Sequence, residues 1–208
     1  MKTEVLLASH PVALPHAADI LRHGGTVAFP TDTVYGLAAL PAVAEYVERL
    51  YIVKGRNSER AIAVLIGSPA DLPKVAVSPS QAALLLAKHF WPGPLTLIVP
   101  RHPDLPEVLS PMPTIGVRMP NHPLALALLR MVGPLAVTSA NISGGKNTTS
   151  AQEVLAQLKG RVHLVIDGGR THGGVPSTVV DCTTAEPAIL RKGPISMEDL
   201  MEALKSGG

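Results

Sequence analysis

Short apolar runs alternate along the chain with stretches that carry apolar residues at helical spacing. The runs predict strands over residues 26–28, 61–66, 95–99, 115–119, 135–138, 162–166, 177–182 and 188–191. The helical stretches predict helices over residues 14–23, 41–53, 78–89, 121–133, 150–159 and 196–205. No repeat, linker or composition break interrupts this alternation. The chain therefore predicts a single α/β domain over residues 1–208, its core from about 13 to 200, with a twisted, mixed β-sheet flanked by helices.

Capping signals fix where several of these helices begin. Ser78 has capping-box spacing to Gln81 with a proline at the first helical position, and Asn121 precedes the next helix as a cap. Ser150 with Glu153 forms another capping box, and Ser196 caps the last helix.

A polar stretch, Pro30–Leu37, directly follows the strand at 26–28. Pro30 lacks an amide donor and ends the strand, and Gly36 permits a turn where a Cβ would obstruct. Thr31, Asp32 and Thr33 crowd together between them. Such a group either faces a ligand or caps a following helix, because Thr and Asp are good caps.

The composition describes a globular protein with little tendency to disorder. Hydrophobic residues make up 46% of the chain and charged residues 16%. No apolar run approaches the ~20 residues that cross a bilayer, and residues 1–25 lack a signal-peptide pattern, so we expect a cytoplasmic protein with no membrane association.

The cysteine and the histidines offer no metal site. The single cysteine, Cys182, excludes an internal disulfide and a cysteine-based zinc site, and its apolar neighbours indicate a buried strand residue. The eight histidines are scattered without ligand spacing, so we expect no protein-built transition-metal site.

Polar and cationic residues gather where strands end. Arg118, Ser139 with Asn141, Asp167 and Arg191 all stand at or just after a predicted strand. Residues converging from several strand ends make a ligand site in an α/β fold.

The cations within this group favour a phosphorylated ligand. Lys54, Arg56 and Arg60 lie close together in sequence, and arginine binds phosphate or carboxylate in a bidentate manner. A solvated basic loop explains Lys54–Arg60 equally well in isolation, and an ordinary turn explains residues 139–145. The net charge of +2 and an aromatic content of 3% give little support for nucleic-acid binding.

Several standard signatures are missing. The chain contains no GxxxxGK[ST], no GxGxxG and no GxSxG motif. P-loop hydrolysis, dinucleotide redox chemistry and serine hydrolase chemistry are therefore disfavoured.

At these residues the chain resembles the YrdC-like family of L-threonylcarbamoyladenylate synthases. The matching segments occur in family order over nearly the whole chain: Pro30–Leu37, Lys54–Arg56, Trp91–Thr96, Val117–Pro120, Thr138–Asn141 with Ser143–Gly144, Ser177–Asp181 and Arg191–Gly193. The resemblance implies an open, concave, positively charged face on the twisted sheet.

The resemblance also implies a nucleotidyltransferase. The enzyme would condense L-threonine, bicarbonate (or CO2) and ATP, with Mg²⁺ bridging the phosphates, to threonylcarbamoyl-AMP and pyrophosphate. Downstream tRNA threonylcarbamoyl transferase proteins would use that product to modify tRNA.

The family's pattern implies two groups of site residues. The ATP side would comprise Lys54, Arg56, Arg60, Ser139, Asn141 and Arg191, with Lys54 and Arg56 as the catalytic pair. The threonine side would comprise Thr31, Thr33, Tyr35, Arg118 and Ser177, with Arg118 as the partner of the substrate carboxylate.

Two departures from the family's pattern affect the pocket. The basic loop is followed by Arg60-Ala61-Ile62 where many relatives read Lys-Pro-Leu, and Leu65 stands near a position where some carry a histidine. An alternative function is a non-catalytic RNA-binding module that uses the basic face. A third reading is the carbamoyl-transfer domain of hydrogenase-maturation proteins. Those proteins carry zinc fingers and an acylphosphatase domain, and this sequence shows neither, which disfavours this reading.

Overall fold

The computed structural model describes residues 1–55, 60–184 and 186–206. Its strands are β1 Glu4–Leu7, β2 Val27–Phe29, β3 Gly36–Ala39, β4 Ala63–Leu65, β5 Leu95–Pro100, β6 Thr114–Arg118, β7 Leu135–Ser139, β8 Leu164–Asp167, β9 Thr178–Asp181 and β10 Ala188–Arg191. Its α-helices are α1 Ala13–Arg22, α2 Ala44–Lys54, α3 Gln81–Phe90, α4 Pro123–Val132, α5 Ala151–Leu158 and α6 Met197–Ser206, and its 3-10 helices are η1 Pro69–Lys74 and η2 Glu107–Leu109.

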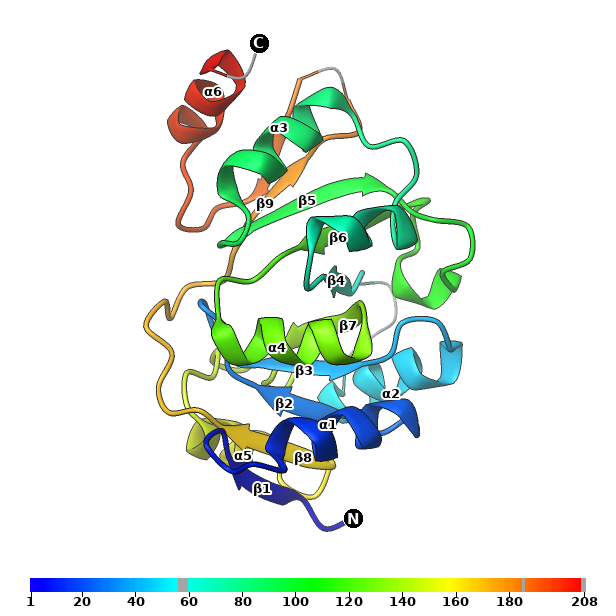
Figure 1. The fold of residues 1–208 in the computed structure, drawn as a ribbon, viewed down its shortest axis with the longest axis vertical. Helices are drawn as coiled ribbons and strands as arrows, with labels where there is room; N and C mark the ends of the chain where they lie inside the picture. The colour runs from blue at the N-terminus through cyan, green and yellow to red at the C-terminus, as the bar shows by residue number, and fades with distance from the viewer. Residues whose placement is uncertain (56–59, 185, 207–208) are drawn as a thin grey trace.

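The described strands form one ten-stranded sheet in the order β1-β8-β2-β3-β7-β4-β6-β5-β9-β10. The sheet is mixed, with parallel pairs such as β1–β8 and β4–β6 and antiparallel pairs such as β3–β7 and β5–β6. The sheet extends along the length of the molecule from β1, near the N-terminus, to the end where α6 lies (Figure 1). The prediction of one α/β domain with a mixed, helix-flanked sheet is confirmed.

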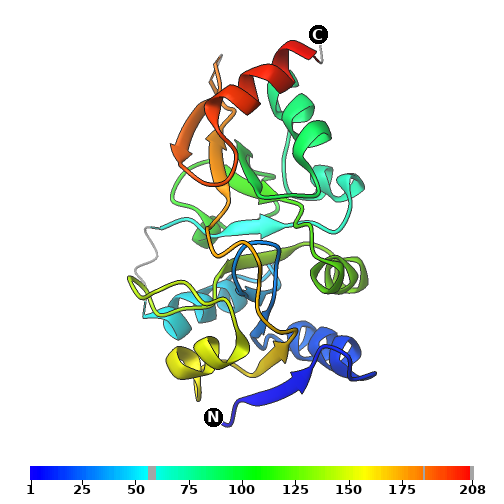
Figure 2. The ribbon, with the colours of Figure 1, turned by 90° about the vertical axis from the view of Figure 1, so that its left-hand side faces the viewer.

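Helices cover both faces of the β1–β7 half of the sheet, α1 and α4 on one side and α2 and α5 on the other (Figure 2). Leu21 of α1 and Leu128 of α4 pack with Phe29 and Val137 in one cluster. Leu50 of α2 and Val154 of α5 belong to the second cluster. Each fully buried leucine contributes ~1.5–3 kcal/mol through burial, so these two clusters fix the frame on which the site is built.

Side chains alternate between the two faces of a strand, and this decides which residues line the open part of the sheet. Along β4, β5 and β6, one face carries Val64, Leu97 and Val117, which belong to the core. The opposite face presents Leu65, Ile98 and Arg118, and these residues line a cavity.

The structure corrects two predicted helix starts. Helix α3 is capped by Ser80 and not by Ser78, because the Ser80 hydroxyl accepts from the Ala83 amide and also donates to the Cys182 carbonyl. Helix α4 is preceded by His122 and not by Asn121, because Pro123 occupies a first-turn position. The caps at Ser150 and Ser196 are confirmed.

Two strands were not predicted, and one residue was misplaced. β1 is a short edge strand, and β3 begins at Gly36, which was interpreted only as part of a turn. Lys54 is the last residue of α2 and does not belong to a loop. Within the described residues, no helix combines the length and apolar character needed to cross a membrane.

Candidate active site

Every described residue that the family's pattern implied for the site lines one cavity of about 430 Å³, from which the strand-end candidate Asp167 is absent. These residues are Thr31, Thr33, Tyr35, Lys54, Arg60, Arg118, Ser139, Asn141, Ser177 and Arg191. Arg56, the other predicted catalytic residue, lies outside the described residues. Its predicted role stays a prediction.

The polar stretch after β2 leads into β3, so it does not cap a helix. The Thr31 hydroxyl donates to the Val34 carbonyl at 2.7 Å and lies 3.1 Å from the Thr33 hydroxyl. Arg118 donates through Nη1 to Thr33 Oγ1 at 3.0 Å. Because a hydroxyl has one proton, Thr33 must donate to Thr31, and the chain of hydrogen bonds runs from Arg118 to Val34 in one direction.

Arg118 ends β6 and is buried at the back of this turn. Besides Thr33, its guanidinium donates to the Gly93 carbonyl through Nε and forms an ion pair with Asp32 through Nη2. Burial lowers the pKa of Arg118, and the charge of Asp32 acts in the opposite direction.

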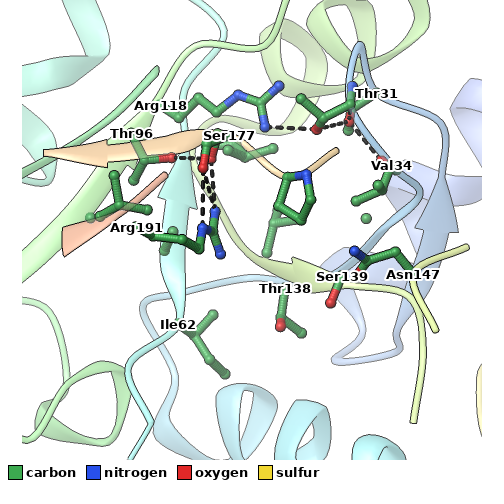
Figure 3. A pocket seen from close by; sticks show the side chains of 18 of the residues that line it. Thr31, Val34, Ile62, Thr96, Arg118, Thr138, Ser139, Asn147, Ser177 and Arg191 are labelled. Atoms are coloured by element: carbon green, nitrogen blue, oxygen red, sulfur yellow. Dashed lines mark hydrogen bonds between the residues drawn. The ribbon is translucent and has the colours of Figure 1, made fainter. Parts of the chain in front are cut away.

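A second cluster lies across the cavity. Arg191 of β10 donates through Nη2 to Ser177 Oγ at 3.0 Å, and Ser177 Oγ is 2.8 Å from Thr96 Oγ1 (Figure 3). Arg191 also donates to the Ser177 carbonyl, so it is fixed to the segment that enters β9. Arg191 from the predicted ATP group therefore meets Ser177 from the predicted threonine group.

Lys54 holds the loop that follows β7. Its ammonium donates to the carbonyls of Ser139 at 2.5 Å and of Asn141 at 2.6 Å. The Asn141 amide in turn donates to the carbonyls of Ile142 and Gly145. Lys54 is almost fully buried, so it shapes the loop from beneath.

Tyr35 is also buried and links the polar turn to the chain beyond β8. Its hydroxyl donates to the Gly169 carbonyl at 2.7 Å and accepts from the Gly168 amide at 3.2 Å. Burial, with a smaller contribution from Asp167, raises the pKa of Tyr35 to about 12. Tyr35 is therefore a neutral hydrogen-bonding group at physiological pH.

The cavity is cationic. Among its described lining residues are Lys54, Arg60, Arg118 and Arg191, and none of the described lining residues is a carboxylate. Hydroxyl and amide groups complete the polar part of the lining. Such a set suits a ligand with several negative charges.

Sequence reasoning assigned no role to several lining residues, Thr96 and Ile98 among them. Thr96 is a single hydroxyl in an apolar strand, and its alternation with Ile98 along β5 is the signal that places both on the cavity face. Asp32 was noted only as part of the polar stretch, yet it neutralises Arg118.

Neither Cys182 nor a metal cluster adds to the site. Burial raises the pKa of the Cys182 thiol to about 12, so the buried strand-end thiol is unreactive. In the part of the chain that the structure describes, no group of three His, Cys, Asp or Glu side chains is placed to hold a metal ion.

The sequence of this chain is similar to those of proteins named threonylcarbamoyl-AMP synthase. The threonylcarbamoyl-AMP synthase of Bacillus subtilis is 42% identical over 197 residues, which cover 93% of this chain and 57% of the relative. A putative threonylcarbamoyl-AMP synthase of Mycobacterium tuberculosis is 40% identical over 90% of this chain and 87% of the relative. The chain thus spans little more than half the length of the Bacillus relative.

Solved structures agree with the sequence relatives. The structure of P. abyssi Sua5 complexed with L-threonine superposes with a TM-score of 0.93 at 38% identity, over 98% of this chain and 61% of that one. E. coli YciO superposes with a TM-score of 0.85 at 28% identity, over 96% of this chain and the whole of the other. The model of the Sua5/YciO/YrdC family, described as "Telomere recombination", matches residues 19–193, and the chain belongs to this family.

Proposed function

We propose that this protein is an L-threonylcarbamoyladenylate synthase, a nucleotidyltransferase. It condenses L-threonine, bicarbonate (or CO2) and ATP to threonylcarbamoyl-AMP and pyrophosphate. The product serves downstream transferase proteins that modify tRNA. The observation that carries the proposal is a cationic cavity without a described carboxylate, in a chain related to named synthases.

The reaction divides into two bond-forming steps. The threonine amine attacks CO2, loses a proton and becomes a carbamate. A carbamate oxygen then attacks the α-phosphorus of ATP, and the bond from that phosphorus to pyrophosphate breaks. Neither step needs a protein nucleophile, so the work of the protein is positioning and charge neutralisation.

The residues divide between the two substrates. Arg118 and the hydroxyls of Thr33 and Ser177 are assigned to threonine, because a guanidinium binds a carboxylate. Lys54, with Ser139 and Asn141, shapes a loop whose hydroxyl and backbone groups are assigned to the phosphates, and Arg191 joins them. Arg56 and Arg60 complete the cationic side.

Mg²⁺ enters this proposal as part of the ATP complex. The described lining supplies hydroxyl and amide oxygens and no carboxylate, which fits an ion held chiefly by the phosphates. When bound there, Mg²⁺ would neutralise charge on the leaving pyrophosphate.

The alternative of a non-catalytic RNA-binding module is not favoured. A cavity of about 430 Å³, within the size range of small-molecule sites, gathers Lys54, Arg60, Arg118 and Arg191. The relatives are named as synthases.

The test is release of pyrophosphate from ATP and Mg²⁺ by the purified protein. We expect release that depends on both L-threonine and bicarbonate, with threonylcarbamoyl-AMP identified by mass spectrometry. Arg118→Ala should lower kcat/KM by roughly 10–100-fold or more, the effect of losing hydrogen bonds to a charged group. Equal release without threonine would contradict the proposal.

A further inference from the structure

Asp32 is absent from the described lining of the cavity, although its neighbours Thr31 and Thr33 belong to it. Its side chain is 14% exposed, and its Oδ1 accepts from Nη2 of Arg118, whose own side chain is 7% exposed. The contact is therefore largely shielded from water. Such a pair holds its geometry far better than an exposed salt bridge does.

Three acceptors fix the plane of the Arg118 guanidinium. Nε donates to the Gly93 carbonyl at 3.0 Å, Nη1 to Thr33 Oγ1 at 3.0 Å and Nη2 to Asp32. The path of the chain at Gly93 excludes a side chain, because a Cβ there would lie 2.4 Å from the Phe90 carbonyl oxygen. Arg118 is thus set by two loops distant in sequence.

This arrangement also limits what Arg118 can offer a ligand. A guanidinium has five N–H groups, and three are donated to described protein acceptors. Two at most remain for an arriving carboxylate. Their direction follows from the plane of the guanidinium, which Asp32 helps to fix through Nη2.

The charges around Arg118 also indicate that hydrogen-bond geometry matters more than net charge for binding a carboxylate. Asp32 already balances Arg118, so an arriving carboxylate gains less from net charge than from well-aimed hydrogen bonds. His122 lies in the field of the same carboxylate, but burial lowers its pKa, which leaves it neutral near pH 7. The negative charge of Asp32 is thereby left to Arg118.

We propose that Asp32 is a positioning residue that aims Arg118 at the carboxylate of the amino-acid substrate. It does so without touching the substrate. The inference rests on the proposed function for the identity of that substrate as threonine.

The experiment measures KM for threonine and for ATP separately in Asp32→Asn and Asp32→Ala. Asp32→Asn keeps the shape and the Oδ1 acceptor but removes the charge, whereas Asp32→Ala removes both. We expect the threonine KM to rise about 10-fold or more in Asp32→Ala and by less in Asp32→Asn. The ATP KM should stay within about twofold in both.

A double-mutant cycle tests whether Asp32 acts through Arg118. The effect of Asp32→Asn should disappear in an Arg118→Lys background, because lysine cannot present the planar fork that Asp32 aims. An unchanged threonine KM in the single variants, or the same effect in both backgrounds, overturns the inference. So does a matching rise in the ATP KM.

Two further measurements keep the inference testable if variants are unstable. Melting temperatures report folding, and if Asp32→Ala does not fold the isosteric Asp32→Asn decides. A structure of the unaltered protein with threonine should retain the Arg118–Asp32 contact, and a broken contact overturns the inference.

Threonine binding followed by melting-temperature shift separates this inference from the proposed function. Unaltered protein that binds threonine but releases no pyrophosphate refutes the function, while the Asp32 effect on binding is still decided.

Discussion

At the scale of single residues, buried and half-buried polar side chains join segments that are far apart in sequence. Tyr35 links the polar turn to Gly169, and Lys54 links the end of α2 to Ser139 and Asn141. His163 is a third example, because its Nδ1 accepts from the Thr26 amide at 3.0 Å. Each of these side chains ties two segments together through hydrogen bonds.

The protonation state of His163 makes stability depend on pH. Burial, and to a lesser degree the charge of Arg49, lowers its pKa below the usual value of about 6.5. The unfolded chain therefore binds a proton that the folded one resists. We expect the melting temperature to fall as the pH drops from about 6.5 towards the folded pKa.

Substitutions test whether His163 causes this loss of stability at lower pH. His163→Asn, whose side-chain oxygen can replace the Nδ1 acceptor without titrating, should lose less stability than the unaltered protein over the same range. His172→Asn, at an exposed position, serves as the control and should follow the unaltered protein. If the melting temperature of His163→Asn followed the same pH profile as that of the unaltered protein, His163 would not be the cause of the loss.

At the scale of elements, the loop between β7 and α5 forms one wall of the cavity. Ser139, Asn141 and Ser143 line it, and Lys54 holds it from one side. From the other side, Gln157 of α5 accepts from the Ile142 amide at 3.0 Å and donates to the Lys146 carbonyl at 3.0 Å. The loop is therefore held from both sides.

This arrangement predicts a selective effect for Gln157→Leu. The substitution keeps the side-chain bulk but removes both hydrogen bonds, which are worth ~0.5–1.5 kcal/mol each. We expect the KM for ATP to rise several-fold while the KM for threonine stays constant. Gln152→Leu, on the exposed side of the same helix, is the matched control. A rise confined to the KM for threonine would show that the loop serves threonine binding, which would contradict this prediction.

The elements also explain which predictions succeeded. Helix α5 was predicted well because its capping box is local, contained in Ser150 and Glu153. The start of α3 was wrong because its choice of serine depends on the carbonyl of Cys182, which is remote in sequence. β1 was missed because it is short, largely exposed and defined by its pairing with β8.

The candidate site was easier to predict than the sheet order. Arg118, Ser139 and Arg191 stand at strand ends, which the apolar runs locate in the sequence, whereas Lys54 ends α2. The Asp32–Arg118 contact was not predicted, since nothing in residues 30–37 indicates which of their polar groups meets β6. That information exists only in the register of strands that pair across the whole chain.

At the scale of the whole molecule, residues 168–177 connect β8, near one edge of the sheet, to β9, near the other. This connection passes against the polar turn, where the Gly174 amide donates to the Thr33 carbonyl at 2.8 Å. A Cβ at Gly173 would lie 2.5 Å from the Asp32 carbonyl oxygen. The connection and the turn that holds Arg118 are thus in direct contact.

Gly173→Ala tests that contact. The added methyl group meets backbone atoms of Asp32 and Thr33, so we expect a loss of ~1–3 kcal/mol in unfolding free energy. Because the displaced turn carries the partners of Arg118, the threonine KM should rise as well. His172→Ala, exposed on the same connection, should change neither quantity. An unchanged unfolding free energy in Gly173→Ala would show that residues 168–177 can shift to accommodate the methyl group, and would contradict a tight contact with the turn.

The order of strands has a consequence for how the protein is made. β1 pairs with β8, some 160 residues later, and β3, which pairs with β2 on one edge, gains its second neighbour only when β7 exists. On the ribosome, the apolar faces of β2 and β3 therefore emerge long before the strands that complete them. Arg191 reaches Ser177 later still. Until then the nascent chain carries unpaired strand edges, which expose it to aggregation during synthesis.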